Sequence, residues 1–502
     1  MESGDEHAIE SDAMESGDEH ATESDTESDT DRISELPGDI LQKILSCVRI
    51  RTVVRMRRLS RRWRKLCESL QFIHLDYRDF ENWKLKKFAR FVNNLLLVRR
   101  KVDLHTFQLH WDPHAPLNCN DVRMWIGYAV KHNVKVLDVE LYQYDKTNLP
   151  PGIFTCRSLQ ELNLQWGDAR DRDYQHMGLV LPDIINLPSL KRLTLCDVEV
   201  DQASLDTFIT QSPGLEDLNL IDSAMYLDLI ASKALKRLNL DGFLDGCDGL
   251  TISAPHLISF ECTGCSLDAI SWRDQPSIES ACIDTSGRSF DGESKFTGVL
   301  THAKKLALFG MDIKVMLEQE LPTCSAFESL ATLEFGNWYL TKDLFVVLRF
   351  LQLSPRLEKL TLRHRPLGKG AETDGMPIAG MTFQCPFLER VIVQCSKDDD
   401  GVDKLVNVLV MIGISADQIN IAFHEDIEKR EHVEMRHADE ERWKELKIFE
   451  KMAKKNPEWM DDDEPYAMSE PDSERSDPSA MSEPDSEQSD ADSDEYDDDD
   501  DF

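Results

Sequence analysis

The sequence has no apolar run approaching the roughly 18 residues of a membrane-spanning helix. Its first 31 residues are polar and acidic, so we expect no secretory signal at this end. The 12 cysteines are scattered at wide intervals along 502 residues, unlike the dense spacing of a disulfide-stapled domain. These absences predict free thiols in a reducing compartment, the cytoplasm or the nucleus.

Motifs for catalysis and nucleotide binding are also missing. The sequence has no phosphate-binding P-loop, no serine-hydrolase nucleophile motif and no HExxH pattern, and its 14 histidines show no metal or triad spacing. Cys262 and Cys265 form a single CxxC pair, whereas a four-ligand zinc site needs a second pair. We therefore predict a non-catalytic protein without a cofactor or metal ion.

Acidic charge is concentrated at the two ends of the chain. The net charge is −37, but residues 1–31 hold 13 acidic and no basic residues, and residues 461–502 hold 20 acidic residues and one basic residue. The remaining residues, 32–460, hold 61 acidic and 56 basic residues, so this part is nearly neutral. Both ends contain a duplicated 13-residue block and too few apolar residues to form a core. We predict two disordered acidic tails, 1–31 and 461–502.

A pattern of apolar-x-x-apolar-x-apolar recurs twelve times between the tails. The copies begin at Leu104, Val134, Leu159, Leu190, Leu215, Leu235, Leu257, Ile278, Ala303, Leu330, Leu357 and Leu388. Their mean spacing of about 26 residues lies in the range of leucine-rich repeats. Such units cannot close a core alone and must stack, which predicts an α/β leucine-rich-repeat solenoid, or horseshoe. In this pattern Cys262 and Cys265 occupy repeat positions, which favours a structural role over a metal site.

The polar strand residues between the leucines face away from the core and are the candidate target-binding face. Arg192, Asp217 and Arg237 hold the same place in successive repeats, so these charges could pair with one another as readily as with a ligand. The candidate residues are Glu161, Asn163, Arg192, Thr194, Asp217, Asn219, Arg237, Asn239, Ser259 and Glu261.

A short helical segment precedes the repeats. Its apolar residues follow helical spacing from Ile40 to Leu45, Thr52 and Ser60 could cap two further helices, and about 40 residues are too few to be stable alone. The order of its residues is Leu36-Pro37-x-x-Ile40-Leu41-x-x-Ile44-Leu45, then Val53-Val54-Arg55, then Leu59-Ser60-x-x-Trp63-x-x-Leu66.

This segment, residues 32–76, resembles an F-box. The resemblance implies docking to a Skp-type adaptor and, through it, to the cullin–RING scaffold of an SCF ubiquitin ligase. Where the family usually has proline and often an acidic residue, this chain reads Val48-Arg49-Ile50-Arg51. The residues expected to form or support the adaptor interface are Leu36, Pro37, Ile40, Leu41, Ile44, Leu45, Val53, Val54, Leu59, Trp63 and Leu66.

Repeats are expected over residues 77–326. Residues 327–425 resemble the FBD region of plant F-box/leucine-rich-repeat proteins, and their apolar spacing predicts strand, helix, strand, with a helix over 344–353. A final helix within 426–460, starting near Asp426 or Asp439, carries Trp443, Leu446, Phe449 and Met452 at helical spacing and could cap the repeat stack.

The predicted function is target recognition within an SCF ligase, with an unknown target protein and no membrane partner. The alternative is a leucine-rich-repeat scaffold, or an acidic histone-binding protein, that acts outside a ligase. Nine basic residues fall between Arg49 and Lys65, but no aromatic stacking platform accompanies them, so a solvated basic face is favoured over nucleic-acid binding.

Overall fold

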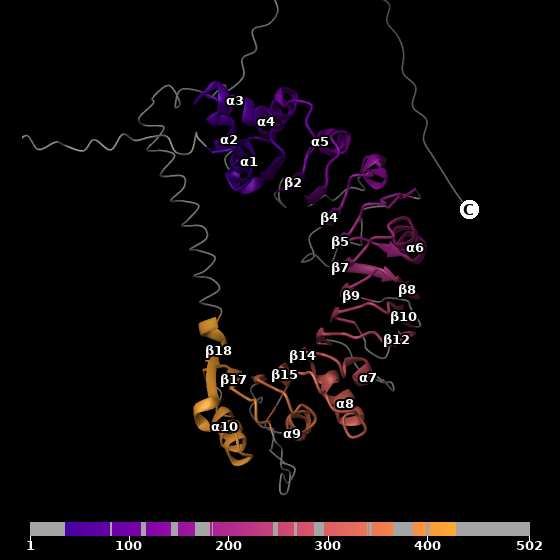
Figure 1. Cartoon of the computed structure of the whole chain (residues 1–502), viewed down its shortest axis with the longest axis vertical. Coiled ribbons are helices and arrows are strands. Elements are labelled where there is room, and N and C mark those ends of the chain that lie inside the picture. Colours follow the sequence, from indigo (N-terminus) through magenta and orange to yellow (C-terminus); the bar gives the residue numbers. More distant parts are fainter. Residues whose placement is uncertain are drawn as a thin grey trace, which may run out of the picture. The chain divides into compact units, whose positions relative to one another are not determined.

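The computed structural model (Figure 1) describes residues 36–80, 83–111, 117–141, 149–165, 181–182, 184–243, 249–265, 269–285, 296–338, 340, 344–364, 385–397 and 401–427. Contacts divide the chain into two units, residues 1–446 and 447–502, and all described residues belong to the first. The predicted acidic tails and nearly all of the predicted helix over 426–460 lie outside the described residues. No described helix is both long enough and apolar enough to cross a membrane.

Three short helices form the F-box segment. They are α1 (Gly38–Ser46), α2 (Ile50–Met56) and α3 (Arg61–Glu68). Ser60 caps α3 as predicted, because its side chain accepts a hydrogen bond from the backbone N–H of Trp63 at 3.2 Å. The predicted cap at Thr52 is wrong: α2 begins earlier, at Ile50, whose side chain is buried, and Arg49 occupies the capping position.

A 15-stranded parallel sheet runs through the rest of the described residues. Its strands, in hydrogen-bonded order, are β1 (Phe72–Asp76), β2 (Thr106–His110), β3 (Val136–Glu140), β4 (Glu161–Gln165), β5 (Arg192–Cys196), β7 (Asp217–Tyr226), β9 (Arg237–Phe243), β11 (Ser259–Thr263), β13 (Ser280–Asp284), β14 (Lys305–Phe309), β15 (Thr332–Trp338), β16 (Lys359–His364), β17 (Arg390–Cys395) and β18 (Ile419–Phe423), with β6 (Val200–Asp201) beside β7.

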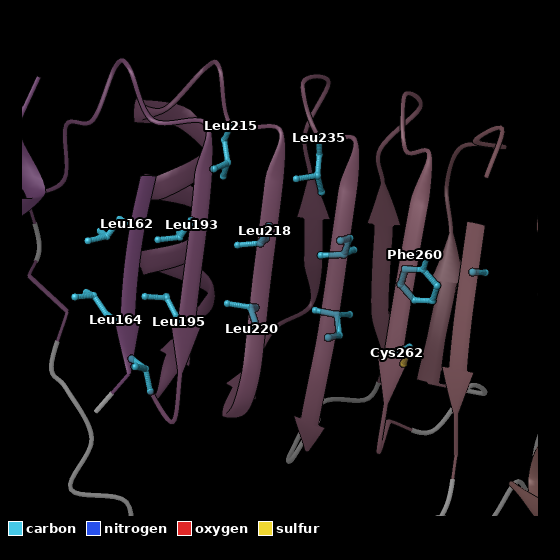
Figure 2. Close-up of a cluster of buried hydrophobic side chains, with 14 of the residues drawn as sticks. Leu162, Leu164, Leu193, Leu195, Leu215, Leu218, Leu220, Leu235, Phe260 and Cys262 are labelled. Carbon is cyan, nitrogen blue, oxygen red and sulfur yellow. The ribbon is translucent and has the colours of Figure 1, made fainter. Parts of the chain in front are cut away.

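All twelve predicted repeats are confirmed as strands, β2 to β17. Strands β1 and β18, which form the two edges of the sheet, were not among the predicted repeats, although Leu70, Ile73 and Leu75 give β1 the same pattern. Each of the twelve predicted strands buries at least two apolar side chains, and Figure 2 shows Leu162 and Leu193 in one such row and Leu164 and Leu195 in the next. Burying one leucine contributes about 2 kcal/mol, so stacking is what stabilises each unit.

The segments between strands vary along the chain. Helical connections are α4 (Leu85–Val98), α5 (Cys119–Lys131), α6 (Gln202–Gln211), α7 (Phe296–Leu300), α8 (Met311–Glu320), α9 (Leu344–Leu353) and α10 (Val402–Met411), with 3-10 turns η1 (Tyr77–Asp79), η2 (Pro151–Thr155) and η4 (Ala416–Gln418). In the middle repeats short strands β8 (Leu229–Ala231), β10 (Leu250–Ser253) and β12 (Ile270–Trp272) form a second parallel sheet. The order β15, α9, β16 confirms the strand, helix, strand prediction for the FBD-like region.

One chain of backbone hydrogen bonds fixes the register of the repeats. The residue just before a strand donates its N–H to the carbonyl of its counterpart one repeat earlier, as Gln160 does to Lys135 (2.7 Å) and Lys191 to Gln160 (2.8 Å). The same bond recurs from Lys135 to Glu389 along the sheet. Equivalent residues of neighbouring repeats therefore lie side by side, which positions the polar residues considered next.

Candidate functional site

The F-box residues predicted for adaptor binding separate by burial. Leu41, Leu45, Val53 and Trp63 are buried in the core, and Leu36, Val54 and Leu66 are partly buried against it. Pro37, Ile40, Ile44 and Leu59 are exposed, and the three large side chains among them keep between 40% and 44% of their surface in solvent. Helical periodicity could not separate these groups, because Ile40 and Leu41 are adjacent residues of one broad apolar stripe.

The opposite side of the F-box is joined to the first repeats. Helices α1 and α2 pack against the edge strand β1. At the end of α4, the Arg99 side chain donates to the carbonyl of Leu70 (2.6 Å), and the backbone N–H of Arg100 donates to the carbonyl of Glu68 (2.6 Å). The F-box therefore covers one edge of the sheet, and its core is continuous with the core of the repeats.

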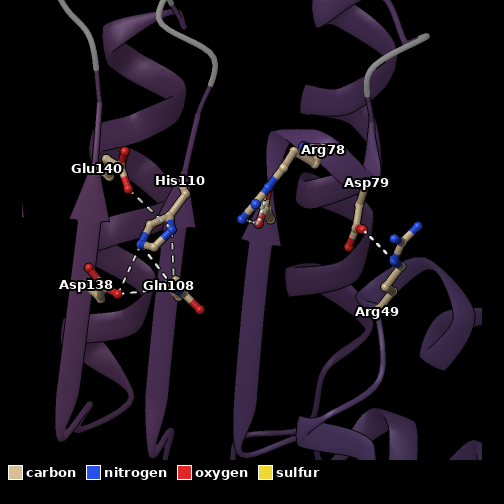
Figure 3. Close-up of polar contacts among 8 residues, drawn as sticks. Arg49, Arg78, Asp79, Gln108, His110, Asp138 and Glu140 are labelled. Atoms are coloured by element: carbon tan, nitrogen blue, oxygen red, sulfur yellow. Dashed lines mark hydrogen bonds and ion pairs between the residues drawn. The ribbon is translucent and has the colours of Figure 1, made fainter. Parts of the chain in front are cut away.

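Arg49 and Arg51, where the chain departs from the F-box pattern, belong to this junction. The Arg49 Nε lies 3.1 Å from the Asp79 carboxylate (Figure 3), and Arg51 donates to the Asp79 carbonyl at 2.8 Å. The Arg51 guanidinium also lies 4.7 Å from the ring centre of Trp83, a cation–π contact. Both arginines therefore bind the segment after β1, on the repeat side of the F-box.

The nine basic residues between Arg49 and Lys65 also differ in burial. Arg49, Arg51 and Arg57 are partly buried, and Arg57 pairs with Glu68 at 3.4 Å. The others are exposed: Arg55, Arg58, Arg61, Arg62, Arg64 and Lys65. The cluster is thus part structural and part solvated surface.

The candidate target-binding face contains a ladder of internal ion pairs. Arg192 Nη1 lies 2.8 Å from Glu161, and Arg192 Nε lies 3.1 Å from Asp217, whose other side meets Arg237 at 2.6 Å. In the next row, Asn163 donates to Asp138 (2.7 Å) and Asn219 donates to Thr194 (3.0 Å). Asp217 is buried, and its charge is neutralised by Arg192 and Arg237 on the two neighbouring strands. The structure thus brings these predicted residues together, but the charged ones among them bind each other.

The last predicted residues of this face lie further along the same surface. Asn239 and Ser259 are partly buried, and Glu261 is exposed, on β9 and β11. Cys262 and Cys265 are buried beside them, and Cys262 lies in register with Leu240 and Ile283. The hydrogen bond to Cys265, together with burial, raises the pKa of Cys262. Cys262 therefore fills its predicted apolar slot in the repeat.

A second polar group lies on β2 and β3 and was not predicted. His110 Nε2 lies 3.0 Å from Asp138 Oδ2, and its Nδ1 lies 3.5 Å from Glu140 (Figure 3). Burial lowers the pKa of His110, but its hydrogen bond to the Asp138 carboxylate and the charges of Asp138, Glu140 and Asp76 outweigh it, so the pKa is raised. The sequence offered only one indication of this group: His110, Asp138 and Glu140 occupy strand positions that face away from the core in the first repeats.

Fold and surfaces define the class of protein: a leucine-rich-repeat solenoid with an F-box covering its first strand. Comparison with known families agrees. The profile described as "At1g61320/AtMIF1, LRR domain" matches residues 96–370, and that of the F-box domain matches residues 33–75.

Relatives with the same domains occur in Arabidopsis thaliana. The FBD-associated F-box protein At4g10400 is 29% identical over 346 residues, which are 66% of this chain and 77% of that protein. The F-box/FBD/LRR-repeat protein At4g26340 is 28% identical over 344 residues, also 66% of this chain and 77% of that protein. This chain belongs to the plant F-box/leucine-rich-repeat family and carries an FBD-like C-terminal region. Proteins of this family are generally non-catalytic adaptors.

Proposed function

We propose that this protein is the target-recognition subunit of an SCF-type ubiquitin ligase. Its F-box would dock a Skp-type adaptor, and through it a cullin–RING scaffold, while the repeats bind a target protein. The chain itself would carry out no chemistry, since a ligase of this kind needs it only to hold the target near the charged conjugating enzyme.

The observation that supports this proposal best is the exposed apolar group Pro37, Ile40, Ile44 and Leu59. The F-box buries its other apolar residues internally or against the repeats, yet leaves three large aliphatic side chains at least 40% exposed. Exposed apolar groups on an otherwise well-packed helical module are typical of a protein-binding surface. We further propose a cytoplasmic or nuclear location, which the free state of every described cysteine supports.

Co-purification with a plant Skp-type adaptor tests the docking. The variant Ile40→Glu/Ile44→Glu places two carboxylates in the exposed apolar group, and we expect it to recover at least tenfold less adaptor than the wild type. The matched control is Leu97→Glu/Met124→Glu, since Leu97 and Met124 are also exposed, at 75% and 50%, but lie on α4 and α5. This control should recover the adaptor as the wild type does.

The same experiment separates the two functional hypotheses. Recovery of adaptor and cullin with the wild type supports the ligase subunit. Recovery of histones, or of no ligase subunit, would instead favour the scaffold or histone-binding alternative. Equal adaptor recovery by the Ile40→Glu/Ile44→Glu variant would show that the exposed apolar group is not the docking surface.

A further inference from the structure

The ion-pair ladder does not continue into the second half of the sheet. The outward residue at the start of each strand is Glu161, Arg192, Asp217 and Arg237 in β4, β5, β7 and β9, so signs alternate and neutralise. The same position in β11 to β17 holds Ser259, Ser280, Lys305, Thr332, Lys359 and Arg390. We call Lys305, Lys359 and Arg390 the cationic row.

Register places these three side chains close together. Lys359 and Arg390 are direct partners on neighbouring strands, and Lys305 lies two strands from Lys359, with Thr332 of β15 between them. Neighbouring parallel strands lie about 4.8 Å apart, so the row extends over about 14 Å from β14 to β17. Like charges directly opposite each other on adjacent strands repel, in contrast to the attraction within the ladder.

No described residue neutralises the cationic row. All three side chains are exposed, and within the described ranges none of them makes an ion pair. Glu334, on the same face of β15, is held by Arg363 at 2.7 Å. Glu358 and Glu389 directly precede two of the cations in sequence, yet neither is paired with them. Three cations are therefore available to an external anion.

The surface beside the row suits an extended peptide. The next outward position holds Ala307 in β14, Glu334 in β15, Thr361 in β16 and Ile392 in β17. Of these four residues only Glu334 is charged, and it is paired with Arg363, while Thr361 is buried. About 14 Å corresponds to four or five residues of extended chain, at roughly 3.4 Å per residue. A run of acidic residues laid across the starts of β14 to β17 could pair with all three cations, because the carboxylate of Glu334 beside them is already neutralised by Arg363.

We propose that the cationic row binds an acidic segment of the target protein. This inference rests on the proposed function, because it names the chemistry of the target that the repeats would recognise. Nucleic acid fits less well, because Phe309, on the same strand as Lys305, is buried with the Arg363 guanidinium 4.3 Å above its ring and offers no free face for base stacking.

The test uses the full chain and a fluorescein-labelled peptide of alternating Glu and Ser, with fluorescence anisotropy as the readout. We expect Lys305→Glu/Lys359→Glu/Arg390→Glu to weaken binding at least tenfold in about 0.15 M salt, where longer-range charge effects are screened. The matched control, Arg123→Glu/Arg356→Glu/Lys404→Glu, changes the net charge equally at exposed positions outside the row and should bind within about twofold of the wild type. The milder Lys305→Gln/Lys359→Gln/Arg390→Gln should also weaken binding, which guards against misfolding of the charge-reversed chain.

The position at which the peptide crosslinks shows whether it binds the cationic row or the basic F-box cluster. A photo-crosslinking version of the peptide should label residues within 301–397, whereas labelling confined to 49–65 would overturn the proposal. Equal peptide affinity of the wild type and the charge-reversed variant would also overturn it, as would tighter binding of a labelled single-stranded oligonucleotide of equal charge through the same three residues.

Adaptor recovery, measured on the same variants, keeps the two proposals apart. The charge-reversed variant should recover adaptor normally while losing the peptide. If the wild type recovers no adaptor, the ligase proposal fails, and the peptide measurements still decide whether the row binds acidic segments. If adaptor is recovered and peptide affinity is unchanged, only the acidic-segment inference fails.

Discussion

Arg49 Nε lies 3.1 Å from Asp79 Oδ1, so a residue of the F-box is ion-paired to the turn that follows the first strand of the sheet. The Asp79 side chain is only 11% exposed and that of Arg49 is 29% exposed, which limits screening by water. The pair helps explain why basic residues replace the usual F-box residues here. They join the F-box to the repeats and leave the exposed group of Ile40 and Ile44 unaffected.

A double-mutant cycle can measure this pair. We expect Arg49→Ala and Asp79→Ala to show a coupling of about 1 kcal/mol, the upper end for a partly exposed ion pair. The quantity to measure is the opening free energy of the β1 amides by native-state hydrogen exchange. Arg90→Ala, at an exposed position of α4, should leave these amides unchanged. Strictly additive single mutants would show that the two side chains do not stabilise the junction together.

The His110 group predicts a pH dependence of stability. Because the pKa of His110 is raised in the folded protein, its stabilising contribution is complete below the unfolded pKa of about 6.5 and is lost as pH rises through the folded pKa. His110→Gln should therefore cost stability at about pH 5.5 and much less above the folded pKa.

His74 contributes in the opposite direction, because its pKa is lowered mainly by burial and also by the charge of His110, so the same comparison is repeated in a His74→Gln background. The measurements are urea unfolding of both proteins and an NMR titration of the His110 ring. A His110 pKa at or below 6.5 in the NMR titration would contradict the expectation.

Gly336 is required by the close approach of β15 and β16. Its φ is +150°, and a Cβ atom there would lie 2.1 Å from the backbone oxygen of Arg363. We expect Gly336→Ala to destabilise the protein by roughly 2 kcal/mol or more, because a backbone neighbour cannot move aside as a side chain can.

Gly127→Ala is the control for this substitution. Gly127 lies inside α5 with nothing within 4 Å of an added Cβ atom, so alanine should stabilise the helix by about 0.5–1 kcal/mol. Thermal unfolding compares the two variants. A melting temperature of Gly336→Ala equal to that of the wild type would show that β15 and β16 can separate at little cost.

Periodicity predicted most of this fold because the repeat period is written directly in the sequence. All twelve apolar-x-x-apolar-x-apolar copies are strands, from Leu104 to the strand that follows Leu388. The two edge strands were not predicted, for different reasons. Strand β18 keeps Ile421 45% exposed and does not follow the buried pattern. Strand β1 follows it at Leu70, Ile73 and Leu75, all buried, but lies within the segment 32–76 that was assigned to the F-box. The predicted assignment of residues 426–460 to a capping helix stays a prediction.

The sequence predicted which residues belong to the candidate surfaces, but not which of them are exposed or unpaired. The motif named the F-box residues, but Leu41 and Ile40 differ in burial although they are neighbours in one apolar stripe. The outward strand positions followed from alternation, yet whether Asp217 is free or neutralised depends on Arg192 and Arg237, which lie 25 and 20 residues away along the chain. Contacts between residues this far apart in the sequence form only when the repeats stack.

The sequence by itself determined the repeat period, the leucine positions, the F-box motif and the segregation of acidic charge to the two ends, because each is a local property of composition and spacing. Tertiary structure decided which apolar residues stay exposed, that Arg49 and Arg51 join the F-box to the repeats, and that the charged ladder ends before Lys305, Lys359 and Arg390. Burial and ion pairing depend on which repeat stacks beside which, and in what register, and a side chain's partners are set by that neighbour across the sheet.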